Sequence, residues 1–163
     1  LLPMRKSKVT GAWEAALPGW GLVDARTLKP IDPYALVTDE RIEMTPWEIH
    51  DMAVQVVLQH LKSEGFKMMS WQGSPHVDPS IWFVGESKRP EWVVVRPAVY
   101  PETKAPRPAN WSAIAQSCAK LSNIGHFASV SLVCIDELMA LGEDEPMRLW
   151  RGHRMSAEFE GLE

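Results

Sequence analysis

The run Trp92-Val93-Val94-Val95 constrains the fold more than any other segment of the chain. Successive side chains of a strand point to opposite faces of the sheet, so an unbroken apolar run does not suit a strand with one face in water. Valine is β-branched and favours strands over helices. The run therefore predicts a central strand buried on both faces, as in a sheet that is covered by helices on each side.

A helix is predicted ahead of this run. Thr45 and Glu48 form the pattern of a capping box around a proline at the first helical position, and apolar residues then recur at helical spacing. Gly65 supplies the left-handed residue that commonly ends a helix. We therefore expect a helix over residues 46–64, followed by a strand over residues 66–72.

A second set of cap and turn residues divides the rest of the core. Asn110 can cap a helix and Gly125 can end it. The order strand, helix, strand allows a parallel pairing with the central run. The elements expected here are strands over 80–84 and 91–96 joined by a turn over 85–90, a proline-rich crossover over 97–109, a helix over 110–124, and a buried strand over 126–135.

We expect a single domain over residues 1–163 of the α+β class, with an α/β-like core in which helix, strand, β-hairpin, helix and strand surround a mixed central sheet. Residues 1–44 combine turn formers with apolar residues such as Trp13, Trp20 and Tyr34, and are expected to wrap the core. The core is expected over 45–135 and an extension over 136–163, with a short helix in the acidic stretch 136–145 and a closing hairpin of 147–150 and 155–159. An edge strand followed by an irregular tail is the alternative to that hairpin.

Composition limits the partners and the compartment. No stretch approaches the roughly 18 uninterrupted apolar residues that a membrane span needs, and the start lacks the apolar run of a secretory signal. We expect no membrane partner and a cytoplasmic location. Cys118 and Cys134 fall inside a predicted helix and strand, which favours two reduced, buried thiols over a disulfide. Because the first residue is Leu1, we also expect a segment that precedes it.

A net charge of −4 does not gather nucleic acid non-specifically, so such a partner would need a local basic patch. The alternative is that the basic residues are solvated surface charges. The two candidate patches are Lys104, Arg107 and Lys120, and Arg148, Arg151 and Arg154.

The order of the core elements, with Asp78 ahead of the hairpin, resembles the core of the restriction-endonuclease-like PD-(D/E)xK nuclease superfamily over about residues 46–135. The resemblance implies that Asp78 matches an acid that holds a divalent metal. It further implies that Glu48 matches an acid of the first helix, and Gln116 a glutamine of the second helix.

The same resemblance places the acid and lysine of the third strand at Val94 and Arg96. A valine cannot ligate Mg²⁺, which requires oxygen donors. Arg96 could hold a phosphate, but a guanidinium does not shuttle protons from water. The essential pair of the superfamily is therefore missing at the expected positions.

Other residues leave a metal site open. Glu86-Ser87-Lys88 is an acid-x-lysine string in the predicted turn, and it would build a site with Asp78 if the preceding strand extended through it. Glu91 is a further acid that could join Asp78. His76, two residues before Asp78, could share a metal with it and with groups of the first helix. The alternative is that Asp78 shapes the turn while His76 is exposed.

The leading hypothesis is a non-catalytic, nuclease-like module without a cofactor, which binds or assembles with itself or with another protein. The alternative is a Mg²⁺-dependent nuclease or phosphodiester hydrolase that uses Asp78 with Glu86 and Lys88, or with Glu91. A third possibility is a small-ligand or protein-binding domain whose likeness to nucleases is accidental.

Overall fold

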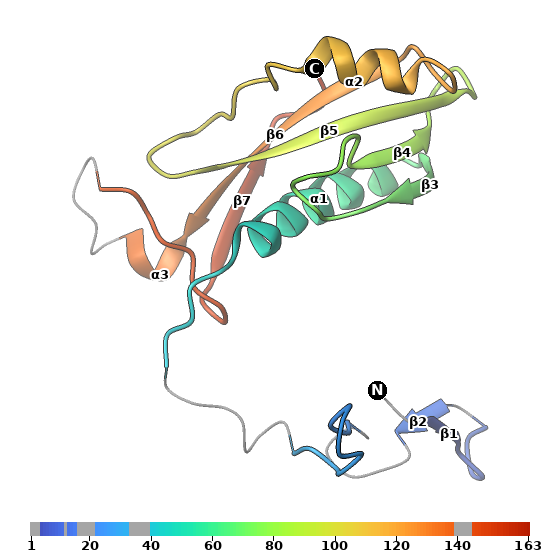
Figure 1. Ribbon diagram of the computed structural model, residues 1–163, viewed down its shortest axis with the longest axis vertical. Helices are drawn as coiled ribbons and strands as arrows, with labels where there is room; N and C mark the ends of the chain where they lie inside the picture. The colour runs from blue at the N-terminus through green and yellow to red at the C-terminus, as the bar shows by residue number, and fades with distance from the viewer. Residues whose placement is uncertain (1–3, 12, 16–21, 33–39, 139–144) are drawn as a thin grey trace. The chain divides into compact units, whose positions relative to one another are not determined.

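The computed structural model describes residues 4–11, 13–15, 22–32, 40–138 and 145–163 (Figure 1). The chain divides into two compact units, Leu1–Glu40 and Arg41–Glu163. In the first unit, β1 (Met4–Lys6) pairs with β2 (Trp13–Ala15) in antiparallel register. The side chain of Trp13 and the whole of Trp20 and Tyr34 lie outside the described residues. The wrapping of residues 1–44 around the core stays a prediction.

The second unit has the predicted α+β fold, built on a five-stranded sheet of order β3-β4-β5-β6-β7. Strands β5 and β6 are parallel, and the other neighbours are antiparallel. In chain order its elements are α1 (Pro46–Ser63), β3 (Lys67–Trp71), β4 (Ile81–Val84), β5 (Pro90–Val99), α2 (Trp111–Cys118), β6 (Gly125–Cys134), α3 (Ile135–Leu138) and β7 (Met155–Phe159).

Strand β5 lies at the centre of the sheet and is buried on both faces, as its apolar run predicts. Val93 and Val95 pack in the core that includes α1, whereas Val94 packs with Ile114 and Cys118 of α2. Figure 1 shows α1 and α2 on opposite faces of the sheet. Each fully buried valine of this kind stabilises the fold by about 1.5–3 kcal/mol.

The start and end of α1 are set by the residues that the sequence indicated. The Thr45 backbone N–H donates to Glu48 Oε2 at 2.8 Å, and the Glu48 N–H donates to Thr45 Oγ1 at 3.3 Å, which completes the capping box. At the other end Gly65 has φ +83°, a conformation that glycine adopts without strain. Strand β3 follows at once and forms one edge of the sheet.

The predicted crossover from Pro97 was wrong, because β5 continues through that residue. The backbone polar groups of Val93 and Val95 point toward β4. The Val93 carbonyl accepts from Ser80 N at 2.9 Å, and the Val95 N–H donates to Ser80 Oγ at 3.3 Å. By alternation Pro97 turns to the same side. Strand β4 pairs with β5 no further than Val93, so the N–H that proline lacks would have had no strand partner.

The predicted second helix was too long. Helix α2 ends at Cys118, and the next residues form turns in which the Leu121 and Ser122 N–H groups donate to the Cys118 carbonyl at 2.9 Å. Asn110 occupies the cap position without a side-chain hydrogen bond. Gly125 begins β6 instead of ending the helix. A Cβ at that position would lie 2.0 Å from Cζ2 of Trp92, so glycine is required by the indole packed against it.

The closing hairpin was also wrong, and the edge-strand alternative fits better. Within the described residues, strand β7 pairs only with β6, at the sheet edge opposite β3. Residues 147–150 are irregular but buried in part: Leu149 is 1% exposed and its carbonyl accepts from Met44 N at 2.8 Å. The short helix of the acidic stretch is α3, and residues 139–144 lie outside the described part.

Cys118 and Cys134 are free and buried, as the sequence predicted. None of the helices in the described ranges is long and apolar enough to cross a membrane.

Replacing Gly125 with alanine should destabilise the protein by about 1–3 kcal/mol, because the added methyl group overlaps the Trp92 indole and forces the core to shift. Urea unfolding followed by fluorescence measures the change. The control Ser156→Thr adds a methyl group on the exposed part of β7 and should change stability by less than about 0.5 kcal/mol. Equal losses in the two variants would contradict the packing role of Gly125.

Candidate functional site

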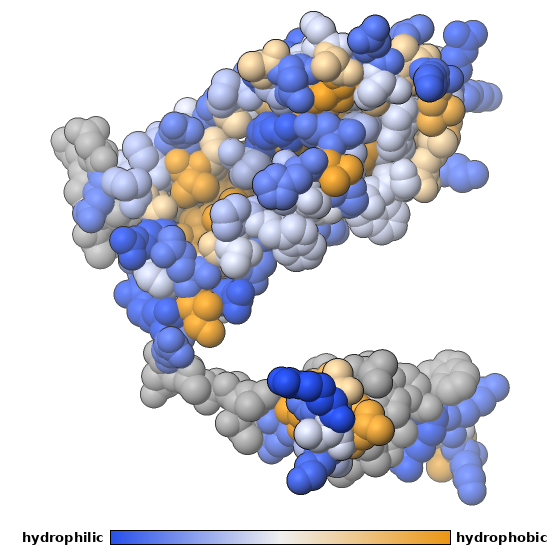
Figure 2. Space-filling model, in the orientation of Figure 1, coloured by the Kyte–Doolittle hydropathy of each residue, from blue (hydrophilic) through white to orange (hydrophobic). Residues whose placement is uncertain are grey.

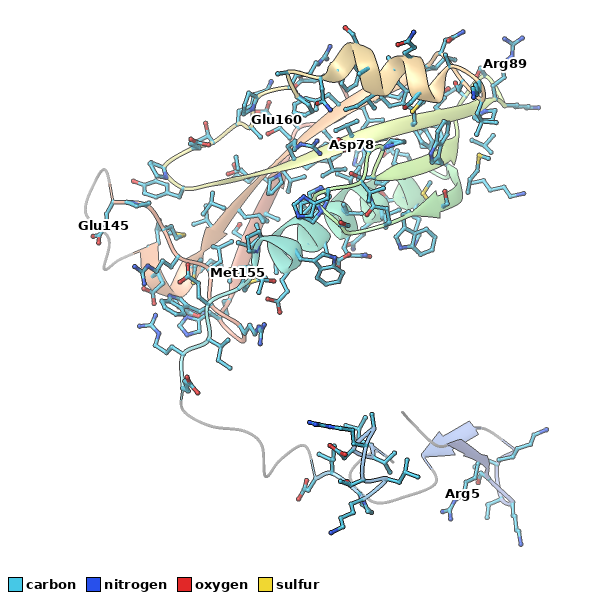
Figure 3. The ribbon with its side chains drawn as sticks, in the orientation of Figure 1. Arg5, Asp78, Arg89, Glu145, Met155 and Glu160 are labelled. Atoms are coloured by element: carbon cyan, nitrogen blue, oxygen red, sulfur yellow. The ribbon has the colours of Figure 1, made fainter. Side chains whose placement is uncertain are left out.

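Asp78 lies in the loop between β3 and β4, close to the central strand (Figure 3). Hydrogen bonds inside the loop fix its path. The Gln72 side chain accepts from Ser74 N at 2.6 Å and donates to the Val77 carbonyl, while Gln72 N donates to the Ser80 carbonyl at 2.9 Å. These bonds give Asp78 a defined position in a segment without regular secondary structure.

The carboxylate of Asp78 is bonded through both oxygens to the guanidinium of Arg96. Arg96 Nη1 donates to Asp78 Oδ1 at 3.0 Å and Nη2 donates to Oδ2 at 2.6 Å. The side chains are 14% and 24% exposed, so solvent screens this pair only in part. Bidentate, charge-assisted bonds of this type are among the stronger hydrogen bonds in proteins. The sequence analysis proposed Asp78 as a metal ligand and Arg96 as a phosphate ligand. In the structure the two side chains bind each other.

His50 of α1 connects the loop to β5 close to the Asp78–Arg96 pair. Its ring is 2% exposed, with Nδ1 2.9 Å from the Gly73 carbonyl and Nε2 3.2 Å from the Val95 carbonyl. Arg96 Nη1 also donates to the Val95 carbonyl, at 2.8 Å. Both ring nitrogens therefore face backbone oxygens instead of the carboxylate of Asp78. The position of His50 three residues before the buried Ala53 is the signal that could have placed it in the core.

Val94 and Cys118 lie on the α2 side of the sheet, near the Asp78–Arg96 pair. Val94, at the position where the nuclease resemblance requires an acid, is fully buried. Burial raises the pKa of the Cys118 thiol, and the negative charge of Asp78 adds to that rise. A raised pKa keeps a thiol protonated and weakly nucleophilic, so Cys118 has the properties of a core residue.

The acid-x-lysine string lies far from Asp78. Glu86 and Lys88 are exposed in the turn that follows β4, and Lys88 has φ +59°. Asp78 precedes the same strand, and its four residues, Ile81–Val84, span about 13 Å. Strand β4 ends at Val84 and does not extend through the string. Glu86 and Lys88 are therefore at the opposite end of β4 from Asp78.

Glu91 belongs to a different cluster. It is 8% exposed, its Oε2 lies 2.7 Å from His126 Nε2, and its Oε1 accepts from Ser87 Oγ at 3.4 Å. Five residues separate Glu91 from Arg96 along β5, about 17 Å, and an odd separation places the two side chains on opposite faces of the sheet. Sequence reasoning missed His126 as the partner of Glu91, because the two meet only through the β5–β6 pairing.

The remaining candidates do not converge on Asp78. Gln116 and His76 are exposed. Glu48 is engaged in the capping box and with Arg151, whose Nε lies 2.8 Å from its Oε1. The hydrogen bond from the Thr45 backbone, with the Arg151 contact next, lowers the pKa of Glu48 to about 2. Among the residues that the structure describes, no three His, Cys, Asp or Glu side chains are grouped closely enough to hold a metal ion.

Most members of the two candidate basic patches already have partners. This pairing leaves few free positive charges at those patches for a phosphate backbone. The contacts are Lys104 with Glu163 at 2.6 Å, Arg107 over the Trp111 ring at 4.7 Å, Arg148 with Glu43 at 3.9 Å, Arg151 with Glu48 at 2.8 Å and Arg154 with Asp136 at 2.7 Å.

Comparison with known families matched residues 47–163 to the family described as Domain of unknown function (DUF8840). That range is more than two-thirds of the chain. The chain belongs to this family. The comparisons with curated proteins and with solved structures found no match.

The DUF8840 segment begins one residue after the start of α1 and contains every strand of the five-stranded sheet. Asp78, Arg96 and His50 all fall inside it, whereas the Leu1–Glu40 unit falls outside. The candidate site is therefore a feature of the DUF8840 part of the chain.

Arg96→Ala should destabilise the protein by about 2 kcal/mol, because it leaves the Asp78 carboxylate partly buried without its cation. Arg96→Lys should lose less, since it keeps the charge but not the bidentate geometry. Urea unfolding measures both. The control is Arg148→Ala, which removes an exposed pair of 3.9 Å and should cost less than about 0.5 kcal/mol. The prediction fails if the two alanine variants lose the same stability.

Stability at acid pH should depend on Glu48. Its pKa falls from 4.5 in the unfolded chain to about 2 in the folded protein, so its contribution is complete above pH 4.5 and disappears as the pH drops toward 2. Glu48→Ala should be less stable than the wild type at neutral pH, and the difference should shrink across that window. Thermal unfolding at a series of pH values tests this, with Glu102→Ala as an exposed control. A difference that stays constant down to pH 2 would rule out the ionised carboxylate as its source.

Proposed function

We propose that this chain is a non-catalytic module with a restriction-endonuclease-like core, which acts in the cytoplasm by binding or assembling with itself or another protein. The observation that carries the proposal is the bidentate pair in which Arg96 occupies both oxygens of Asp78. In the nuclease resemblance these oxygens would be turned to a divalent metal.

The arrangement of the core supports the resemblance. The resemblance is to the order helix, strand, hairpin, helix and strand, which is the order of α1, β3, β4, β5, α2 and β6. Asp78 comes just before β4, and Arg96 lies on β5. The elements that resemble the nuclease core and the Asp78–Arg96 pair therefore occur in the same segment of the chain.

The chemistry of the pair favours a structural role for Asp78. A metal at these oxygens would have to displace the Arg96 guanidinium, and an unpaired positive charge would remain beside the ion. The second acid that Mg²⁺ would require is replaced by the buried hydrocarbon of Val94. Glu86 and Glu91 do not supply it, because one lies at the far end of β4 and the other on the opposite face of the sheet.

The surface of the module also fits a partner that is not a nucleic acid. On the face drawn in Figure 2, small hydrophobic groups are separated by hydrophilic residues. Half-exposed aromatic side chains, Trp47 at 53% and Trp71 at 50%, can serve as anchors in a protein interface.

The full chain, incubated with supercoiled plasmid DNA and Mg²⁺ or Mn²⁺, should produce no nicked or linear product above the level of buffer alone. Agarose gel electrophoresis is the readout, and a commercial nuclease serves as the positive control. Asp78→Ala and the matched variant Glu158→Ala are assayed in parallel. Cleavage that Asp78→Ala abolishes and Glu158→Ala preserves would falsify the proposal in favour of a metal-dependent nuclease.

A further inference from the structure

An acidic hollow of about 150 Å³ opens where β6 and β7 meet the loop at residues 103–104. The side chains that give it its chemistry are Ser129 and Ser131 of β6, Glu158 of β7, and Glu160, Glu163 and Lys104 around them. At about 30 Å³ for each water in the liquid, the hollow has room for roughly five waters. That is enough for one planar, polar end group of a side chain.

The hollow accepts hydrogen bonds more than it donates them. Lys104 is held by Glu163 at 2.6 Å, and this contact, with a smaller effect of Glu160, raises the pKa of Lys104. Glu158 and Glu160 form no ion pair in the described part of the chain. Ser129 Oγ accepts from Ala105 N at 2.8 Å and keeps a lone pair. Two free carboxylates with hydroxyl neighbours fit a cation that has several N–H donors, which among side chains is arginine.

The same chain presents such a cation. In the described part of the Arg41–Glu163 unit, Lys67, Lys88, Arg89 and Lys120 have neither an acidic nor an aromatic partner. Arg89 and Lys88 are adjacent and exposed in the β4–β5 turn, and Figure 3 shows Arg89 at the tip of that turn, pointing away from the sheet. One acid, Glu86, lies in the same turn, which therefore remains net positive.

We propose that the hollow binds Arg89 of a second copy of this chain, with Lys88 at its rim. Charge complementarity carries the assignment, since free carboxylates face a free guanidinium. The two groups cannot meet within one copy. Ser129 and Ser131 pair with Arg96 and Ala98, which lie seven to nine residues along β5 from Arg89, or about 23–30 Å. No arginine side chain spans that distance.

The contact joins two different surfaces, so it can form twice in a closed two-fold dimer or once per copy in a ring or an open chain. This assignment deepens the assembly role proposed above and rests on it. Its test measures association alone, so a negative result here would leave the absence of DNA cleavage untouched.

Light scattering coupled to size-exclusion chromatography, at a series of loading concentrations of the full chain, should show a mass that grows beyond the monomer. Arg89→Glu and Glu160→Arg should each weaken association by about tenfold or more, because each places like charges together. Mixing two variants provides the decisive arm, and there Arg89→Ala replaces Arg89→Glu, because two reversed charges would attract each other. Arg89→Ala keeps an intact hollow and Glu160→Arg keeps an intact turn, so the mixture should form a one-to-one dimer that cannot grow further.

Lys29→Glu, the same charge reversal at an exposed site in the other unit, should associate like the wild type. Circular dichroism of each variant verifies that it is folded. L-Arginine amide added to the wild type should reduce its mass, whereas uncharged L-citrulline amide should not. A monomer at every concentration, association that Arg89→Glu leaves unchanged, or a mixture of the two variants without a dimer would each overturn the proposal.

Discussion

Strand β5 is the element on which the rest of the structure depends. It pairs with β4 on one side and β6 on the other, and its side chains form part of both hydrophobic cores. A strand buried on both faces must be covered on each side, and α1 and α2 provide this cover. The same strand ends its apolar run at Arg96, so the rigid centre of the sheet also positions the charged group of the candidate site.

That placement explains how a loop without regular structure can carry a defined carboxylate. Asp78 is tied to β5 through Arg96, and the start of the same loop is tied to β5 through His50 and the carbonyls of Gly73 and Val95. A guanidinium supplies a single positive charge in a fixed plane, whereas a divalent ion supplies two and requires further oxygen donors. With valine at position 94, the guanidinium is the partner that balances one carboxylate in a partly buried setting.

The sequence predicted the elements whose signals are local. The capping box at Thr45, the β-branched run of β5 and the order of strands and helices all appear in the structure because neighbouring residues determine them. The errors have tertiary causes. Pro97 is tolerated because β4 has already ended beside it, and Gly125 serves the Trp92 indole instead of a helix end. The burial of Val94 and the exposure of Glu86 agree with the pattern. The contact of His126 with Glu91 depends on the pairing of β5 with β6, and the contact of His50 with the loop depends on the packing of α1, so neither could be predicted from the sequence.

The distribution of charge extends this argument from the site to the surface. Arg148, Arg151 and Arg154 are matched by acids contributed from distant parts of the sequence, so much of the positive charge is used within the fold. Lys88 and Arg89 of the β4–β5 turn have no acidic partner, and neither Glu158 nor Glu160 on the β6–β7 side forms an ion pair within the described residues. Most of the length of the central strand separates these two groups, so they do not meet within one copy. Contact between two copies would bring these two groups together, so the rigid strand β5 bears on the proposed assembly as well as on folding.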